Sequence, residues 1–173
     1  MTTTMSPEVQ TTSLTLAVIL SLLLVLIDAF WLNQGGLAFL VGVSVLLVGL
    51  PRSLLRKFAP TRLQRLRNLG IYLSAVVLVF GLNHLNNQIA QSRADVLVSA
   101  VKNFYSENQH YPQSLNDLVP RYVEQIPSAK YTLTSNEFRY VNSEQGTYLE
   151  YTEVPPFGRP YFSFNKGQWL YMD

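Results

Sequence analysis

One stretch of the chain joins an apolar half to a polar half without any residue that would end a helix between them. From Ile71 to Tyr111 the sequence contains one glycine, Gly81, and no proline. Residues up to Leu85 are nearly all apolar and those from Asn86 are mostly polar, yet an apolar spacing of three and four residues continues across the junction. A helix of about 40 residues would extend for roughly 60 Å, about twice the hydrocarbon thickness of a bilayer. The pattern therefore predicts a helix that begins in a membrane and ends in water.

Charge divides the chain into a membrane part and a water-facing part. Only 14% of the 173 residues are charged, whereas an ordinary soluble domain has about 25%, and Asp28 is the one charged residue between Leu14 and Leu50. We expect residues 1–87 to form a membrane domain and residues 88–173 to form a small separate domain. The expected membrane helices are residues 12–32, 36–50 and 69–86. The second of these is short enough that a re-entrant or interfacial helix is an alternative to a spanning one.

The loop 51–67 between the second and third apolar segments is strongly basic. Its charged residues are Arg52, Arg56, Lys57, Arg62, Arg65 and Arg67. The positive-inside rule places this loop in the cytoplasm and the C-terminal domain outside, which in a bacterium is the periplasm. The loop is either a topogenic segment lying on anionic lipid headgroups or a docking site for a cytoplasmic partner. Residues 88–173 carry seven basic and nine acidic side chains, so they offer no basic face for nucleic acid.

The C-terminal half has the pattern of an α+β domain. Val96, Leu97, Ala100, Val101, Phe104 and Tyr105 form one helical stripe that needs a sheet to cover it. Ser114 and Asp117 have the spacing of a capping box at the start of a short helix that ends before Pro120. Beyond Pro127 the apolar period changes to two. The predicted strands are residues 131–134, 137–141, 147–152, 161–164 and 168–172. A long helix, a short helix and then an antiparallel meander make an α+β order.

The segment HYPQSLNDLVPRY, residues 110–122, resembles the globular region of type II secretion major pseudopilins and of related type IV pilin-like proteins. Ile126-Pro127 resembles the leucine-proline pair of that family, and PFGRPY at 156–161 resembles its later aromatic turn. The positions that carry the resemblance are Tyr111, Pro112, Leu115, Leu118, Pro120, Tyr122, Pro127, Gly158 and Pro160. The resemblance implies a small antiparallel sheet packed on a long N-terminal helix, and a role in assembly through protein–protein contacts.

The chain departs from the family at the positions that support filament formation and calcium binding. Pseudopilins begin with a short basic leader, a glycine and then a glutamate, but here two apolar segments precede Gly70 and no glutamate follows in residues 71–75. Calcium needs several oxygen ligands, and Asp173 is the one acidic residue after the Pro-Phe-Gly turn. We therefore expect no cleavage by a prepilin peptidase and no bound calcium.

The sequence offers little support for catalysis or for a cofactor. His84 and His110 are far apart, no convergent base or nucleophile accompanies Glu150 and Glu153, and the chain has no cysteine and no phosphate-binding or zinc motif. We expect no catalytic, cofactor or metal site. Asp28 is a candidate functional residue, because a carboxylate inside a membrane segment often has a functional role. It either reaches the headgroups or contacts another subunit.

Three functions are compatible with this organisation. The first is a non-enzymatic accessory or assembly protein of a bacterial inner membrane, which binds lipids and other envelope proteins and presents a pilin-like periplasmic module in a pilus or secretion system. The second is a structural subunit of another membrane complex, such as a respiratory or photosynthetic one. The third is a ligand sensor that signals through the long helix. Fold does not fix function, so the choice depends on the partner.

Overall fold

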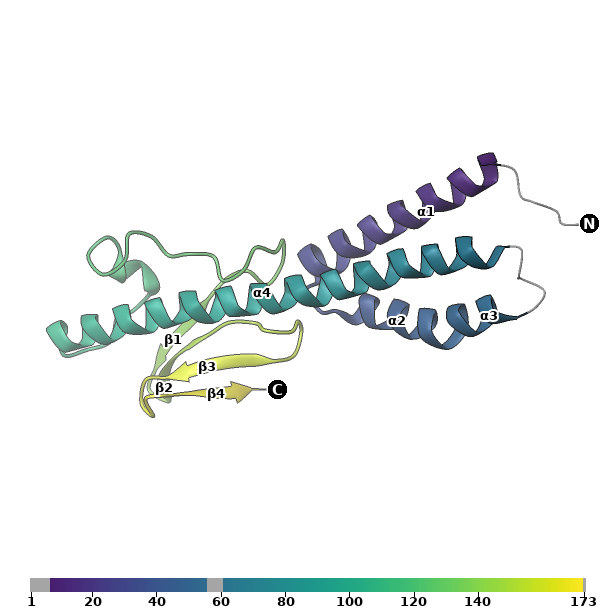
Figure 1. Ribbon diagram of the computed structural model, residues 1–173. Coiled ribbons are helices and arrows are strands. Elements are labelled where there is room, and N and C mark those ends of the chain that lie inside the picture. The colour runs from purple at the N-terminus through teal and green to yellow at the C-terminus, as the bar shows by residue number, and fades with distance from the viewer. Residues whose placement is uncertain (1–6, 56–60, 173) are drawn as a thin grey trace, which may run out of the picture. The chain divides into compact units, whose positions relative to one another are not determined.

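The computed structural model describes residues 7–55 and 61–172, with side chains from Thr11 onward. The chain divides into two compact units, Met1–Asn83 and His84–Asp173. Helix α4 (Arg62–Asn108) is a single helix of 47 residues that contributes to both units. The predicted continuity of residues 69–108 is therefore confirmed, and the helix shows no break at the apolar-to-polar junction (Figure 1).

The first unit consists of helices, and its elements follow one another with few breaks. Helix α1 (Pro7–Val25) continues as the π-helical segment η1 (Leu26–Leu32), and α2 (Gly36–Ser44) continues through π-helical η2 (Val45–Gly49) into α3 (Leu50–Leu54). Within the described residues, three helices are long and apolar enough to cross a membrane: Thr11–Leu32, Gly36–Leu54 and Arg62–Asn108. The start of α1, the end of α3 and the start of α4 lie at the same end of this unit (Figure 1).

The second apolar helix is longer than the sequence indicated. The prediction ended it at Leu50, where the basic loop begins, but the helix runs from Gly36 to Leu54. Pro51 lies in the first turn of α3, a position where a missing N–H and a fixed φ are tolerated. The added turn makes the length of this segment compatible with a full crossing.

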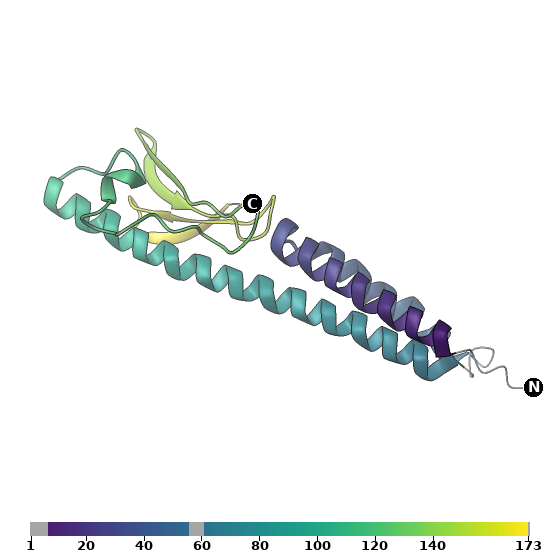
Figure 2. The ribbon, with the colours of Figure 1, turned by 90° about the horizontal axis from the view of Figure 1, so that it is seen from above.

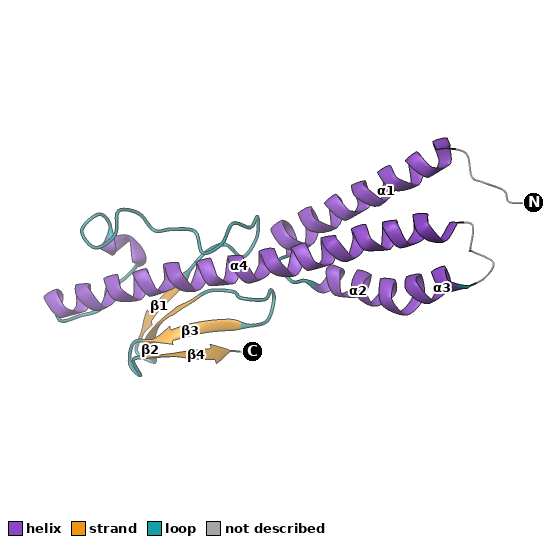
Figure 3. Cartoon of the chain, viewed as in Figure 1, coloured by secondary structure: helices purple, strands orange, loops and turns teal. Residues whose placement is uncertain are grey.

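The second unit is a mixed α+β fold whose sheet has four antiparallel strands. The strands are β1 (Arg139–Ser143), β2 (Gly146–Glu150), β3 (Arg159–Ser163) and β4 (Gln168–Met172). They pair in the order β1-β2-β3-β4, which is the predicted meander (Figure 3). β1 and β2 form a tight hairpin in which Ser143 pairs with Gly146. β1 and β4 are the edge strands.

The strand predicted at residues 131–134 is wrong. This segment has a bent backbone without strand pairing, because Thr132 is engaged locally and its hydroxyl donates to the Thr134 carbonyl at 2.8 Å. The alternation that suggested a strand came from Tyr131 and Leu133, and both side chains are exposed rather than packed on a core. Local side-chain bonds of this kind compete with strand formation.

The core of the second unit lies between α4 and the sheet, which runs along one side of that helix (Figure 2). Helix α4 contributes small and branched residues, among them Ala90, Ala94 and Leu97, and the sheet contributes Leu149 and Phe162. Because alanine has a short side chain, the sheet can approach the helix closely. The sheet side is aromatic, with Phe162 and Trp169 rings in an edge-to-face pair at 5.5 Å.

The predicted helical stripe is only partly buried. Leu97 and Val101 are fully buried, whereas Val96 and Tyr105 lie at the margin with 56% and 41% of their surface exposed. The predicted short helix is present as the 3-10 segment η4 (Leu115–Leu118), and its capping box is formed by the Ser114 and Asp117 side chains. This confirms the local start signal read from the sequence.

Candidate functional site

Asp28 organises the turn between the first two apolar helices. Its carboxylate is fully buried and accepts two backbone hydrogen bonds, from the Gly35 N–H to Oδ1 at 2.8 Å and from the Ala38 N–H to Oδ2 at 2.7 Å. Both donors belong to the start of α2, where N–H groups have no partner within the helix. The carboxylate therefore caps α2 and also complements the positive end of the helix dipole.

Neither role expected for Asp28 describes this geometry. The side chain does not reach outward to headgroups, since none of its surface is exposed and both oxygens accept bonds from the turn. The turn also needs a glycine at position 35, because φ is +73° there and a Cβ atom would lie 2.9 Å from Cε1 of Phe80. Asp28 is thus a structural residue of the hairpin, which the sequence alone did not reveal because its partners are backbone atoms.

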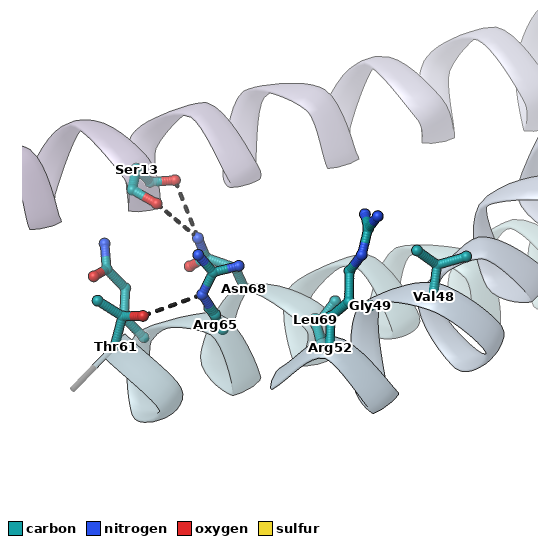
Figure 4. Close-up of a pocket in the computed structure, with 9 residues that line it drawn as sticks. Ser13, Val48, Gly49, Arg52, Thr61, Arg65, Asn68 and Leu69 are labelled. Carbon is teal, nitrogen blue, oxygen red and sulfur yellow. Dashed lines mark hydrogen bonds between the residues drawn. The ribbon is translucent and has the colours of Figure 1, made fainter. Parts of the chain in front are cut away.

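The opposite end of the first unit contains a basic cavity of about 410 Å³ (Figure 4). Its polar lining comes from α1, α3 and the start of α4: Ser13, Arg52, Thr61, Gln64, Arg65 and Asn68. The Arg65 Nε donates to the Thr61 hydroxyl at 3.1 Å, and the Asn68 amide donates to the Ser13 hydroxyl at 2.9 Å. The second bond ties α4 to α1 across 55 residues of sequence.

Only some residues of the predicted basic loop line this cavity. Arg52 and Arg65 line the cavity, whereas Arg67 is exposed and lies outside its lining. Arg62 donates from Nη2 to the Leu54 carbonyl at 3.2 Å, which satisfies the last turn of α3. Arg56 and Lys57 lie outside the described residues. The structure therefore brings two of the predicted basic residues together at one cavity.

The residues that carry the pseudopilin resemblance mostly build the core of the second unit. Leu118 and Pro112 are fully buried, and the Pro112 carbonyl accepts a bond from the Tyr140 hydroxyl at 3.0 Å. The Tyr111 ring lies 5.6 Å from that of Phe164. Leu115 and Tyr122 pack against the same core. These positions hold the segment after α4 against the sheet.

The later motif residues shape the turn before β3. Gly158 has a φ of +69°, and a Cβ atom there would lie 2.6 Å from the Tyr171 hydroxyl, so a glycine is required. Pro160 is buried in β3 and pairs with Tyr171 of β4. Pro127 is half-buried and Pro120 is exposed. None of these residues presents a reactive group, so the motif explains the fold of this unit rather than a chemical site.

The sequence did not predict the burial of two ionisable side chains in the second unit. Lys130 is almost fully buried, and its Nζ donates to the Glu153 carbonyl at 2.7 Å. Burial lowers the pKa of Lys130 to about 8, opposed by the nearby Glu153 carboxylate. Glu150 is also buried and pairs with Arg139 at 3.2 Å. Burial also raises the pKa of the Tyr140 and Tyr151 phenols.

Each of these ionisable groups is held by a local contact. The Lys130 ammonium is held by a backbone carbonyl, and the Glu150 carboxylate by an arginine of the adjacent strand. His84 bonds to Gln88 and His110 to the Tyr111 carbonyl. Within residues 7–55 and 61–172, no group of three or more His, Cys, Asp and Glu side chains could hold a metal ion.

Four exposed apolar residues lie at the end of β4 and in the turn before β3. They are Val154, Phe157, Tyr171 and Met172, which expose 41%, 71%, 54% and 41% of their surface. Met172 pairs with Arg159 at the start of β3, and Val154 pairs with Phe157. We call these four residues the aromatic edge. The sequence signal was present in the PPFG turn and the C-terminal YM pair, but their proximity depends on the β3–β4 register.

No family model, characterised protein or solved structure matches this chain.

Proposed function

We propose that this protein is a non-enzymatic component of a bacterial inner membrane that presents its C-terminal unit to a protein partner in the periplasm. The partner system is a type IV pilus or a related type II secretion machine, as the resemblance of residues 110–122 implies. In this proposal the basic loop faces the cytoplasm and the sheet faces the periplasm. The protein acts by binding, as an accessory or assembly factor.

The observation that supports this proposal best is the double role of α4. The helix is apolar enough to cross a membrane, and its later residues, Ala90 to Val101, form one wall of the core of the second unit. The same helix is therefore both a candidate membrane span and part of the core of the folded unit. A protein that acts by binding can anchor its folded unit in this way.

The aromatic edge is the proposed contact surface. Phe157 and Tyr171 are among the large side chains most exposed in the second unit, and aromatic residues are enriched at protein interfaces. β4 is an edge strand whose outer side has no partner strand within the described residues, so a partner could also add a strand there. Side-chain contacts and strand addition are therefore both available to a partner at this border of the sheet.

Site-specific photocrosslinking in the native bacterium tests this proposal. A photoreactive amino acid replaces Phe157 in the full-length chain, and a second variant carries it at Leu133, which is equally apolar and 76% exposed but lies outside the aromatic edge. We expect a crosslink from position 157, and none from position 133, to a pilus or secretion component. A crosslink from 157 to a respiratory or photosynthetic subunit would replace this proposal with a structural role in that complex. The absence of any protein crosslink at 157 would refute the binding surface.

A further inference from the structure

We propose that the first unit binds one anionic phospholipid, with the phosphate held by Arg52 and Arg65 and one acyl chain in the apolar groove that adjoins their cavity. This site is separate from the aromatic edge, and it does not depend on the identity of the protein partner. It is also more specific than a general attraction of the basic loop to anionic membranes, because two arginines and a shaped groove are involved.

The basic cavity and the apolar groove adjoin each other. The groove has a volume of about 760 Å³ and lies between α1, α2 and the first turns of α4. It shares three lining residues with the basic cavity: Val48, Gly49 and Leu69. From there the groove extends past Leu40 and Leu23 to Ile27 near the turn at Asp28. It therefore follows the helices away from the charged end, the direction in which an acyl chain enters a bilayer.

The first unit carries a surplus of positive charge that favours binding of an anion. Between Met1 and Asn83 the acidic residues are Glu8 and Asp28, against the six basic residues of the loop. Both oxygens of Asp28 accept bonds from the turn at the other end of the unit. If Glu8 neutralises one cation, five positive charges remain. Arg52 has no carboxylate partner among the described residues, and its side chain extends into the cavity (Figure 4).

The chemistry of the lining fits a phosphate diester. Guanidinium groups bind phosphate oxygens through paired N–H donors, and Arg52 and Arg65 lie on different helices that face the same cavity. The Arg65 side chain is oriented by its bond to Thr61, and the adjacent wall is fixed by the bond between Asn68 and Ser13. The cavity volume of about 410 Å³ lies within the roughly 300–1,000 Å³ of known small-molecule sites.

The groove distinguishes a lipid from a free phosphate. Thirteen residues line it, and all except Ser44, Gly49 and Tyr72 are leucine, isoleucine or valine. Such a surface gains nothing from an inorganic anion, whereas each buried methylene of an acyl chain contributes about 0.8 kcal/mol. Basic pockets between membrane helices on the cytoplasmic side are known to bind anionic headgroups. The combined site therefore favours an anionic phospholipid, for which phosphatidylglycerol is a suitable probe.

Native mass spectrometry of the delipidated full-length protein in detergent tests the site. Phosphatidylglycerol, phosphatidylcholine and glycerol 3-phosphate are titrated separately. The variants are the double substitution Arg52→Gln/Arg65→Gln, its rescue form Arg52→Lys/Arg65→Lys, and the control Arg67→Gln, which removes a charge from the same loop outside the cavity. Ser44→Trp fills the groove, and Leu46→Trp places the same ring outside it. Gel filtration checks that each variant is monodisperse.

We expect the wild type to bind one phosphatidylglycerol more tightly than either other ligand. Each cavity arginine contributes roughly fivefold, so Arg52→Gln/Arg65→Gln lowers the affinity by about 25-fold, the lysine form restores most of it and Arg67→Gln changes it little. Ser44→Trp weakens binding and Leu46→Trp does not. Equal losses in Arg67→Gln and the double glutamine variant would overturn the site in favour of general surface attraction. Equal binding of phosphatidylcholine or of glycerol 3-phosphate, or no effect of Ser44→Trp, would also overturn it.

Discussion

Replacing Asp28 by alanine should destabilise the first unit more than replacing a buried polar residue of this unit that makes no hydrogen bond. The carboxylate accepts bonds from Gly35 and Ala38 at 2.8 and 2.7 Å and has no exposed surface. A hydrogen bond to a charged group contributes about 1.5–3 kcal/mol, and loss of an N-cap costs about 1 kcal/mol. Because the two N–H groups would remain buried without water, we expect a loss of about 3 kcal/mol or more in the free energy of unfolding. Asp28→Asn keeps one acceptor oxygen and should lose about half as much.

The measurement is unfolding of the full-length protein in mixed micelles with added SDS. Fluorescence of Trp31, three residues from Asp28, reports on the hairpin when the only other tryptophan, Trp169, is changed to phenylalanine. Ser21→Ala is the matched control, because the Ser21 hydroxyl is buried in α1 and has no hydrogen-bond partner among the described residues. If Asp28→Ala destabilises the protein no more than Ser21→Ala does, the capping role of Asp28 is wrong.

Four further outcomes are expected. Ser92→Pro removes a helical hydrogen bond inside α4 and should cost on the order of 3 kcal/mol, whereas Ser92→Ala at this exposed position should be neutral or slightly stabilising in thermal unfolding. The pKa of Lys130 is lowered to about 8 in the folded protein, so above pH 8 the unfolded chain binds more protons than the folded one. The free energy of unfolding should therefore rise from about pH 8 until the tyrosines begin to ionise near pH 10. This rise should be absent in Lys130→Met, and an equal rise in both proteins would show that Lys130 is not its cause. Alkaline phosphatase fused after Asp173 should be active and a fusion near Arg62 inactive, and the reverse would end the topology proposal. Mass spectrometry of the purified protein should show no fragment that begins at Ile71, since that residue lies inside α4; such a fragment would indicate a processed pseudopilin.

Much of the fold follows from patterns that are local in the sequence. The apolar runs identify the three long helices, because apolar length is a property of consecutive residues. The capping box at Ser114 and the meander beyond Pro127 are likewise set by neighbours a few residues apart. The same reasoning failed at residues 131–134, where Tyr131 and Leu133 have the alternation of a strand but no neighbouring strand to pair with.

The candidate sites depend on contacts that no local pattern contains. The basic residues of the loop were evident from composition. The cavity, however, depends on the packing of α4 against α1, where Asn68 bonds to Ser13, which is 55 residues away in the sequence. The role of Asp28 depends on backbone N–H groups of another helix, and the burial of Lys130 depends on the Glu153 carbonyl 23 residues away. A sequence shows which side chains can bind or ionise, whereas the packing of distant segments decides which of them are buried, paired or open to a ligand.

The charged side chains at the two ends of the first unit differ in whether the protein itself provides their partners. This difference has a consequence for membrane insertion. At the turn, both oxygens of the Asp28 carboxylate accept hydrogen bonds from backbone N–H groups. These bonds stabilise the charge, so the side chain can be buried at this end. At the other end, Arg52 and Arg65 face a cavity that contains no acidic side chain among its lining residues. These cations cannot be moved into the hydrocarbon without their counter-ions. If these helices cross a membrane, the basic end stays at the headgroup level, where anionic lipids can balance its surplus positive charge.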